Sequence, residues 1–265
     1  FDLMQDVQVS SDAAGKARFA LRHSTRLITD AHCSATQAVR LGFGQEKICI
    51  FPWGVDLTHF SPSVARARGT IWRERQAWDG KRVLLCLRSW ELNYGVDVLL
   101  RAFAKAAKKD DDLRLILLGD GSQREHLLRI LQDADLNDKV FLGGRVPNQD
   151  LITYYGAADL YVTPSHVDGS SVSLMEAMAC GLPSVASDIP ANLEWVAEGQ
   201  TGWLFPDGDS DALAELLLRV SSFNLGAVGR RAREFAERHA DWQQNKQQLF
   251  LCWEKALNPS KGRYL

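Results

Sequence analysis

Apolar residues recur along most of the chain in two spacings that predict alternating strands and helices. Short runs that are almost entirely apolar, such as residues 82–87 and 113–118, are typical of strands covered on both faces of a sheet. The segments between them, such as residues 96–108, place apolar residues three and four positions apart, as in an amphipathic helix. Strands that alternate with helices through short connections predict an α/β fold, a Rossmann-like parallel sheet with helices on both faces.

The same pattern gives the expected bounds of each element. The predicted strands are residues 26–29, 47–51, 82–87, 113–118, 139–142, 160–163, 184–186 and 202–205. The predicted helices are residues 13–23, 34–41, 96–108, 123–134, 150–157, 191–197, 209–221, 226–239 and 241–257, with one more helix that ends before Gly181. The proline and glycine around residues 52–62 indicate a hinge or a domain boundary.

The composition argues against several classes of function but does not identify the function of the protein. The 265 residues are 46% apolar and suffice for one large or two small domains. Lys and Arg number 31 and Asp and Glu 33, a net charge of −2 that does not favour a nucleic-acid partner. No apolar run reaches the ~18 residues of a membrane span. The histidines lack metal-ligand spacings, so we expect no metal.

The cysteines are odd in number and scattered, and they lack the C-x-x-C spacing of redox and zinc sites. They stand at Cys33, Cys49, Cys86, Cys180 and Cys252. We therefore expect reduced side chains of a cytoplasmic protein, rather than disulfides.

The most informative stretch is residues 160–183. A short buried strand leads into a polar loop, Asp168-Gly169-Ser170-Ser171, and then into a helix-forming run. A strand, a tight loop and a helix N-terminus together form an anion site, because free N–H groups and the positive helix end favour phosphate. Asp168 and Glu176 flank this site with seven residues between them.

Two structural alternatives remain open for this stretch. In the first alternative, Gly169 serves only to allow the backbone to turn. Ser173 and Glu176 fit the Ser-x-x-Glu capping box, in which the glutamate would cap its own helix.

The stretch resembles the Glu-x7-Glu region of retaining glycosyltransferases of family 4, which have the two-domain GT-B fold. Asp168 replaces the first acid of that motif, and residues 176–183 match it closely. Residues 54–62 resemble the segment that links the two GT-B domains, and the likeness extends from about residue 25 to residue 221.

The resemblance implies a domain order. Residues 1–54 would be the end of the acceptor-binding N-terminal domain, whose remainder we expect to precede residue 1, and residues 55–80 the interdomain linker. Residues 81–240 would bind the nucleotide sugar. The last segment, residues 241–265, would form a helix that crosses back to the first domain, although its apolar spacing suits a core helix equally well.

Roles for the residues of the motif follow from the resemblance. Asp168 would face the donor sugar ring as the catalytic residue, and Glu176 would accept hydrogen bonds from both ribose hydroxyls. The backbone N–H groups that would hold the diphosphate belong to Gly169, Ser170, Ser171 and Val172.

The diphosphate also requires positive charge, for which this chain departs from the family pattern. In most family members the loop after the first strand of this domain provides an arginine and a lysine, but Ser89 and Tyr94 stand at these places. Arg88 is the candidate, because guanidinium pairs well with phosphate. Arg145 would add charge or, with Val146, line the base pocket.

Gly121 completes a Gly-Asp-Gly that relatives share at the donor site. Arg124 breaks the G-x-G-x-x-G fingerprint, so binding of NAD is not supported. Structurally, the two glycines permit a tight turn from strand to helix.

The implied reaction moves a sugar from a nucleotide diphosphate sugar to an acceptor hydroxyl with retention of configuration and without a metal cofactor. The acceptor would be a sugar, a lipid or a polysaccharide precursor. The location would be the cytoplasm or the cytoplasmic face of a membrane, to which the remainder of the first domain would attach peripherally. Because catalysis needs both domains, we expect this chain alone to bind the donor without transferring sugar. The alternatives are a GT-B sugar-nucleotide epimerase and a non-catalytic nucleotide-sugar binding module.

Overall fold

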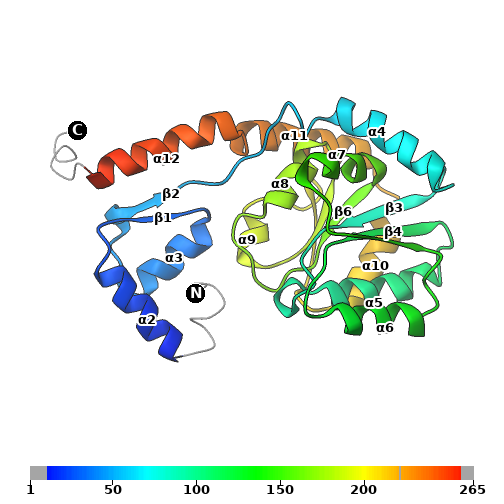
Figure 1. The fold of residues 1–265 in the computed structure, drawn as a ribbon, viewed down its shortest axis with the longest axis horizontal. Helices are drawn as coiled ribbons and strands as arrows, with labels where there is room; N and C mark the ends of the chain where they lie inside the picture. Colours follow the sequence, from blue (N-terminus) through cyan, green and yellow to red (C-terminus); the bar gives the residue numbers. More distant parts are fainter. Residues whose placement is uncertain (1–10, 221, 258–265) are drawn as a thin grey trace.

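The structure is a computed structural model that describes residues 11–220 and 222–257. It contains a small unit, residues 11–51, and a large unit, residues 62–240, joined by the segment between them and by the C-terminal helix (Figure 1). The small unit comprises α2 (Ser11–Arg22), β1 (Leu27–Thr29), α3 (His32–Arg40), the 3-10 turn η1 (Gln45–Lys47) and β2 (Ile48–Ile50).

The large unit alternates strands and helices much as the sequence pattern predicts. Its strands are β3 (Arg82–Cys86), β4 (Leu113–Leu118), β5 (Val140–Gly144), β6 (Leu160–Thr163), β7 (Ser184–Ser187) and β8 (Gly202–Phe205). Its helices are α4 (Pro62–Arg75), η2 (Leu92–Tyr94), α5 (Val96–Ala107), α6 (Arg124–Asp133), α7 (Asn148–Ala157), α8 (Val172–Ala179), α9 (Pro190–Leu193), α10 (Ser210–Val220) and α11 (Leu225–His239).

The six strands of the large unit form one parallel sheet in the order β5-β4-β3-β6-β7-β8. Successive strands extend the sheet outward from β3 in one direction and from β6 in the other, so the order changes between these two neighbours. In open α/β sheets, such a switch point opens a crevice at the carboxyl ends of the strands, where ligands bind. The predicted fold class is confirmed, and the site is expected beyond the ends of β3 and β6.

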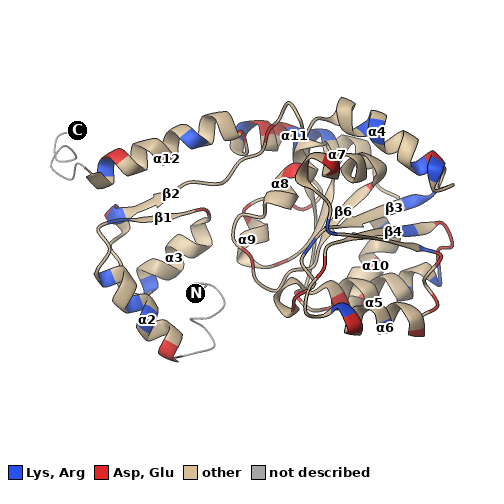
Figure 2. Ribbon diagram, in the orientation of Figure 1, with Lys and Arg blue, Asp and Glu red and all other residues tan. Residues whose placement is uncertain are grey.

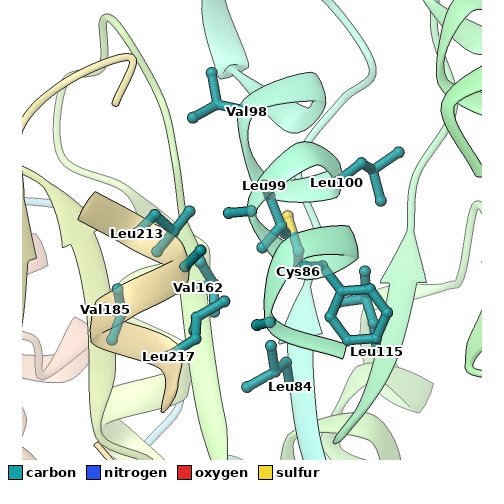
Figure 3. Packing of buried hydrophobic residues seen from close by; sticks show 14 of the residues in the cluster. Leu84, Cys86, Val98, Leu99, Leu100, Leu115, Val162, Val185, Leu213 and Leu217 are labelled. Atoms are coloured by element: carbon teal, nitrogen blue, oxygen red, sulfur yellow. The ribbon is translucent and has the colours of Figure 1, made fainter. Parts of the chain in front are cut away.

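Helices cover both faces of this sheet, which explains why strands such as β3 and β4 are almost entirely apolar. In β3, Leu84 and Cys86 face α5 and α10, whereas Val83 and Leu85 face the side of α7 and α8. Figure 3 shows the first of these layers, where side chains from the sheet meet those of α5 and α10. The labelled residues are Leu84, Cys86, Val98, Leu99, Leu100, Leu115, Val162, Val185, Leu213 and Leu217.

The expected linker, residues 55–80, includes a helix that the apolar pattern did not predict. Helix α4 packs against α7, and a Cβ atom added to Gly69 would lie 2.0 Å from the carbonyl carbon of Gly156. The buried residues of α4 are Ala65 and Gly69. Such small residues bring two helix backbones together but leave no run of large apolar side chains for a periodicity search to detect.

Helix α12 (Trp242–Leu257) extends from the large unit to the small one and lies beside β2 (Figure 1). The Nε atom of Arg26 donates a hydrogen bond to the carbonyl oxygen of Lys255 over 3.2 Å. A disulfide joins Cys49 and Cys252, whose Cα atoms lie 6.2 Å apart.

The expectation that all five cysteines are reduced was therefore wrong. The two bonded residues are 203 positions apart, so no local spacing could indicate the pair. Cys33, Cys86 and Cys180 are free thiols. Because disulfides persist mainly in oxidising compartments, the cysteines no longer support a cytoplasmic location.

Charged residues of both signs are interspersed over the two units (Figure 2). Among the described residues, no single helix is long and apolar enough to cross a membrane. Helices α10 and α11 have the length and mean hydropathy of a membrane span only when they are taken together, and the pair is bent by 109°.

Candidate functional site

The loops that follow β3 and β6 meet at the switch point of the sheet. Arg88 lies two residues beyond the end of β3, and Asp168 lies five residues beyond the end of β6. Because neighbouring parallel strands end at the same edge, these two loops lie side by side. The residues that the sequence singled out in separate motifs are thereby brought together.

Arg88 and Asp168 form an ion pair within this cluster. The Nη2 atom of Arg88 donates to Oδ2 of Asp168 over 2.5 Å, and its Nη1 atom donates to Oγ of Ser171 over 2.8 Å and of Ser173 over 3.2 Å. The arginine side chain is only 9% exposed. Burial raises the pKa of Asp168, and the adjacent guanidinium opposes that rise. Arg88 therefore holds Asp168 and the start of α8 in one arrangement.

Tyr94, which stands at the usual place of the family's lysine, contacts the same arginine. The guanidinium carbon of Arg88 lies 4.4 Å from the centre of the Tyr94 ring, a cation–π distance. Tyr94 thus supports Arg88 and adds no charge of its own. The left-handed backbone of Gly95, with φ of 58°, then turns the chain into α5.

The loop between Asp168 and α8 makes a contact with the small unit that the sequence did not reveal. The N–H of Gly169 donates to Oδ1 of Asp168 over 3.0 Å. The N–H of Ser170 donates to Oδ2 of Asp30 over 3.1 Å, and its hydroxyl donates to the Asp30 carbonyl oxygen over 2.5 Å. A carboxylate of the small unit therefore lies against one of the N–H groups expected to hold a diphosphate.

Helix α8 begins at Val172, immediately after this loop. Ser171 is its N-cap residue, but the serine side chain makes no capping bond and instead accepts from Arg88. The N–H groups of the first helical turn have no acceptor within the helix. This helix end can therefore donate to an anion in the crevice.

Glu176 lies in the second turn of α8 and is buried, with 3% of its surface exposed. Its Oε1 atom accepts from Nδ2 of Asn148 over 2.9 Å, and its Oε2 atom accepts from the hydroxyl of Tyr155 over 2.7 Å. Ser173 lies inside the helix, so the capping-box alternative is excluded. Burial raises the pKa of Glu176, and the two donors offset part of that rise.

Glu176 also forms part of the wall of a 480 Å³ cavity between the large unit and the segment that joins the two units. The opposite wall comes from the segment that joins the units and from the start of α12, including Val55, His59 and Trp242. Asn148 and Val172 line the same cavity. The carboxylate is thus placed at a concave surface that can accept a small molecule.

Arg145 takes no part in the hydrogen bonds and the ion pair of the Arg88 cluster. It follows β5 and is exposed. Hydrogen bonds from Ser122 lower the pKa of Glu91, and the nearby charge of Arg145 lowers it further. Val146 is partly buried against the core on the α7 side. The predicted roles of both residues toward a donor are untested.

Gly121 occupies a place where a side chain would not fit. A Cβ atom there would lie 2.5 Å from the carbonyl oxygen of Trp90, and one on Gly119, where φ is 111°, would lie 2.4 Å from that of Arg88. The N–H of Gly121 donates to Oδ1 of Asp120 over 2.9 Å. These glycines allow the loop after β4 to pack against the loop that carries Arg88.

Sequence reasoning missed three residues that touch the predicted site, namely Asp30, Asn148 and Tyr155. Asp30 directly follows a predicted strand, so its place at a carboxyl end was a usable signal. Nothing in the pattern of the predicted helix distinguishes Tyr155 from its neighbour Tyr154.

Comparison with known proteins identifies the family. The model of the glycosyl transferases group 1 matches residues 70–246, which include the Arg88 loop, the 168–171 loop and Glu176. The chain belongs to this family. The predicted resemblance to glycosyltransferases is thereby confirmed at the level of glycosyl transferases group 1.

Relatives of this group 1 chain include bacterial proteins named as glycosyltransferases and mannosyltransferases. It is 30% identical over 207 residues to the putative colanic acid biosynthesis glycosyltransferase WcaL of Escherichia coli, covering 75% of this chain and 48% of the relative. It is 29% identical over 201 residues to a GDP-mannose-dependent alpha-(1-6)-phosphatidylinositol monomannoside mannosyltransferase of Mycolicibacterium smegmatis, covering 72% and 52%. The chain thus spans about half the length of the curated relatives it matches.

Solved structures share the fold of the group 1 chain across almost its whole length. The Anabaena protein HepE, in complex with UDP, has a TM-score of 0.85 and 20% identity, with 95% of this chain and 70% of that protein covered. Sucrose-phosphate synthase of Thermosynechococcus elongatus has a TM-score of 0.84 and 22% identity, with 97% and 64% covered. At these identities the likeness concerns the fold.

Proposed function

We propose that this chain carries the donor-binding part of a glycosyltransferase that moves a sugar from a nucleotide diphosphate sugar to an acceptor hydroxyl with retention of configuration. One observation carries the proposal. The loop of residues 168–171 leads directly into α8, and the second turn of α8 carries the buried carboxylate of Glu176, at the switch point of the sheet and within the matched family region.

The loop and helix end suit a departing diphosphate. As the sugar leaves, negative charge grows on the diphosphate oxygens, and preorganised N–H groups with a nearby cation stabilise that charge. The donors proposed here are the N–H groups of residues 169–172, and the cation is Arg88. Because these groups and the helix dipole supply positive charge, the proposed transfer uses no metal.

The two acids take different roles in this proposal. Glu176 accepts hydrogen bonds from both ribose hydroxyls, as its place on the cavity wall allows. Asp168, held by Arg88, faces the donor sugar. Retention of configuration rests on the resemblance of residues 168–183 to the retaining family.

The names of relatives support the class of substrate. One mycobacterial relative is GDP-mannose-dependent and acts on a phosphatidylinositol mannoside, and the Anabaena structure contains UDP. The proposed donor is accordingly a nucleotide diphosphate sugar, and the acceptor is a sugar, a lipid or a polysaccharide precursor.

A thermal-shift screen tests the donor site. A ligand that binds only the folded chain raises the melting temperature by mass action. UDP or GDP, or one of their sugars, should raise the midpoint, whereas uridine and guanosine at the same concentration should raise it much less. If no nucleotide diphosphate shifts the midpoint more than its nucleoside, the proposed diphosphate site is wrong.

A further inference from the structure

The carboxylate of Glu176 is held by side chains of the neighbouring helix α7. The hydroxyl of Tyr155 lies 2.7 Å from Oε2 of Glu176 and 3.0 Å from the carbonyl oxygen of Ser173. A tyrosine hydroxyl has one proton to donate. The carboxylate is the nearer and the charged acceptor, so the proton goes to Glu176.

Asn148, the first residue of the same helix, holds the other oxygen. Its Nδ2 atom donates to Oε1 of Glu176 over 2.9 Å. Each carboxylate oxygen therefore receives one bond from α7. An ionised carboxylate has about four lone-pair sites, so each oxygen keeps capacity for one hydroxyl.

We propose that Tyr155 and Asn148 are positioning residues that fix the Glu176 carboxylate in the orientation that accepts the two ribose hydroxyls of the donor. The inference rests on the proposed function, and it extends the donor site to two residues of α7 that act through Glu176.

The two donors hold different oxygens of Glu176 and differ in their surroundings. Tyr155 is 1% exposed and fixed by ring contacts with Phe60, at 5.9 Å between centroids, and with Tyr161, at 6.2 Å. Asn148 is exposed and lines the 480 Å³ cavity. The carboxylate is thus ordered before a ligand arrives, which reduces the side-chain entropy lost on binding.

The arrangement also keeps a buried carboxyl group able to ionise. The titratable groups that face Glu176 or share its cavity are Tyr155, Cys180, His59 and Asp56. Burial raises the pKa of Glu176, while the hydrogen bonds from Tyr155 and Asn148 lower it. Removal of either donor should raise that pKa further and favour the protonated form, which is the poorer acceptor.

The test uses Tyr155→Phe and Asn148→Ala, with Tyr154→Phe as the matched control. Tyr154 is the neighbouring tyrosine, and its ring packs on Trp72 and Phe141. Calorimetry at pH 7.5 would compare binding of UDP or GDP, whichever binds more tightly, with binding of its 2′,3′-dideoxy counterpart. Loss of one hydrogen bond to the charged group should weaken ribonucleotide binding roughly three- to tenfold. Binding of the dideoxynucleotide, and all binding by the control, should change less than about twofold.

A pH series separates positioning from general damage. Ribonucleotide affinity should fall as the pH drops through the folded pKa of Glu176. In Tyr155→Phe and Asn148→Ala this fall should occur at a higher pH than in the natural chain, and in Tyr154→Phe at the same pH. Equal weakening of both nucleotides, or an unchanged pH profile, would show that the two residues serve stability alone.

Glu176→Gln distinguishes failure of this inference from failure of the proposed function. If Glu176→Gln loses ribose-dependent affinity but the two α7 variants do not, the positioning role is wrong and the donor site stands. If Glu176→Gln keeps that affinity, the ribose role of Glu176 fails as well. Should Tyr155→Phe not fold, Asn148→Ala, changed at an exposed position, decides the question.

Discussion

The two acids of the site, the partly buried Asp168 and the buried Glu176, have different electrostatic surroundings. Asp168 has a cationic partner, Arg88, at 2.5 Å. Glu176 takes no part in the ion pairs found among the described residues, and its partners Asn148 and Tyr155 are neutral donors. The charge of Asp168 is therefore offset by a cation within the fold. The charge of Glu176 has no cationic partner, so its burial lowers the stability of the folded state.

Glu176→Gln should accordingly not destabilise the chain at neutral pH. The folded pKa of Glu176 lies above the ordinary 4.5, so the folded state favours its protonated form. The stability from this preference is present below pH 4.5 and is lost as the pH rises through the folded pKa. We expect Glu176→Gln to melt at or above the natural chain at pH 7.5 and to lose that advantage near pH 4. A midpoint several degrees lower at pH 7.5 would contradict this expectation.

Arg88→Ala should destabilise the chain strongly, because it leaves a buried carboxylate without its cation. Breaking a buried pair in this way costs about 3–5 kcal/mol in free energy of unfolding. The double variant Arg88→Ala with Asp168→Asn should recover part of the loss, since no unpaired charge remains.

Denaturant unfolding measures the decrease in free energy of unfolding for Arg88→Ala and for the double variant. Arg101→Ala, from the more exposed pair with Asp97, is the control and should cost less than about 1 kcal/mol. Similar losses for Arg88→Ala and the double variant would mean that the ion pair does not link the two residues energetically.

At the scale of elements, the site depends on close packing between helices as well as on strand order. Helix α7, which carries Asn148 and Tyr155, is backed by α4. The two helices touch through backbone atoms at Gly69 and Gly156. An element that appeared to be a linker in the sequence therefore supports the helix that orients Glu176.

Gly69→Ala should lower the melting temperature, because its new Cβ atom would meet Gly156 and force the helices apart. Overpacking of this kind costs about 1–3 kcal/mol. Gly15→Ala is the matched control, since nothing lies within 4 Å of an added Cβ in α2. There the change should stabilise by about 0.5–1 kcal/mol through helix propensity. Thermal unfolding of the two variants would reveal opposite signs, and equal effects would exclude the tight crossing.

At the scale of the whole molecule, two carboxylates join the small unit to the large one. Asp30 accepts from the N–H of Ser170 in the proposed donor loop. Glu194, after α9, accepts from the N–H groups of His32 and Cys33 at the start of α3, over 3.0 and 2.8 Å. Only the first contact occupies a group that the donor would use.

Asp30→Ala should therefore strengthen binding of a nucleotide diphosphate severalfold. The change frees the Ser170 N–H and removes a negative charge near Asp168. Glu194→Ala also cuts a contact between the units but leaves the loop unchanged, so it should not strengthen binding. Calorimetry with UDP or GDP makes the comparison, and equal gains from both variants would point to separation of the units instead.

The disulfide predicts a thiol count. Denatured, unreduced protein should react at three thiols and reduced protein at five. Cys252→Ser should raise the unreduced count to four, because it frees Cys49 and removes one cysteine (5 − 1 = 4). Five reactive thiols in the unreduced natural chain would show that Cys49 and Cys252 are not bonded.

The sequence by itself determined the alternation of strands and helices, the parallel sheet and the position of the loop of residues 168–171 between β6 and α8. These features depend on apolar periodicity and on turn residues such as Gly169 and Gly181. Such patterns involve residues close together in the sequence, so they can be recognised without knowledge of tertiary contacts. The resemblance to family 4 glycosyltransferases also placed Arg88 and Asp168 in one donor site.

Only the tertiary structure decided which side chains meet. The disulfide from β2 to α12, the contact of Asp30 with Ser170 and the bonds from α7 to Glu176 join residues that are between 21 and 203 positions apart. The sequence likewise did not show that the small residues of α4 bring two helices together. It also left open the choice between a capping and a ligand-facing Glu176. Contacts of this kind depend on how helices pack across the sheet and on how the two units meet. Helix packing and contact between the units produce no periodic pattern of apolar residues in the sequence.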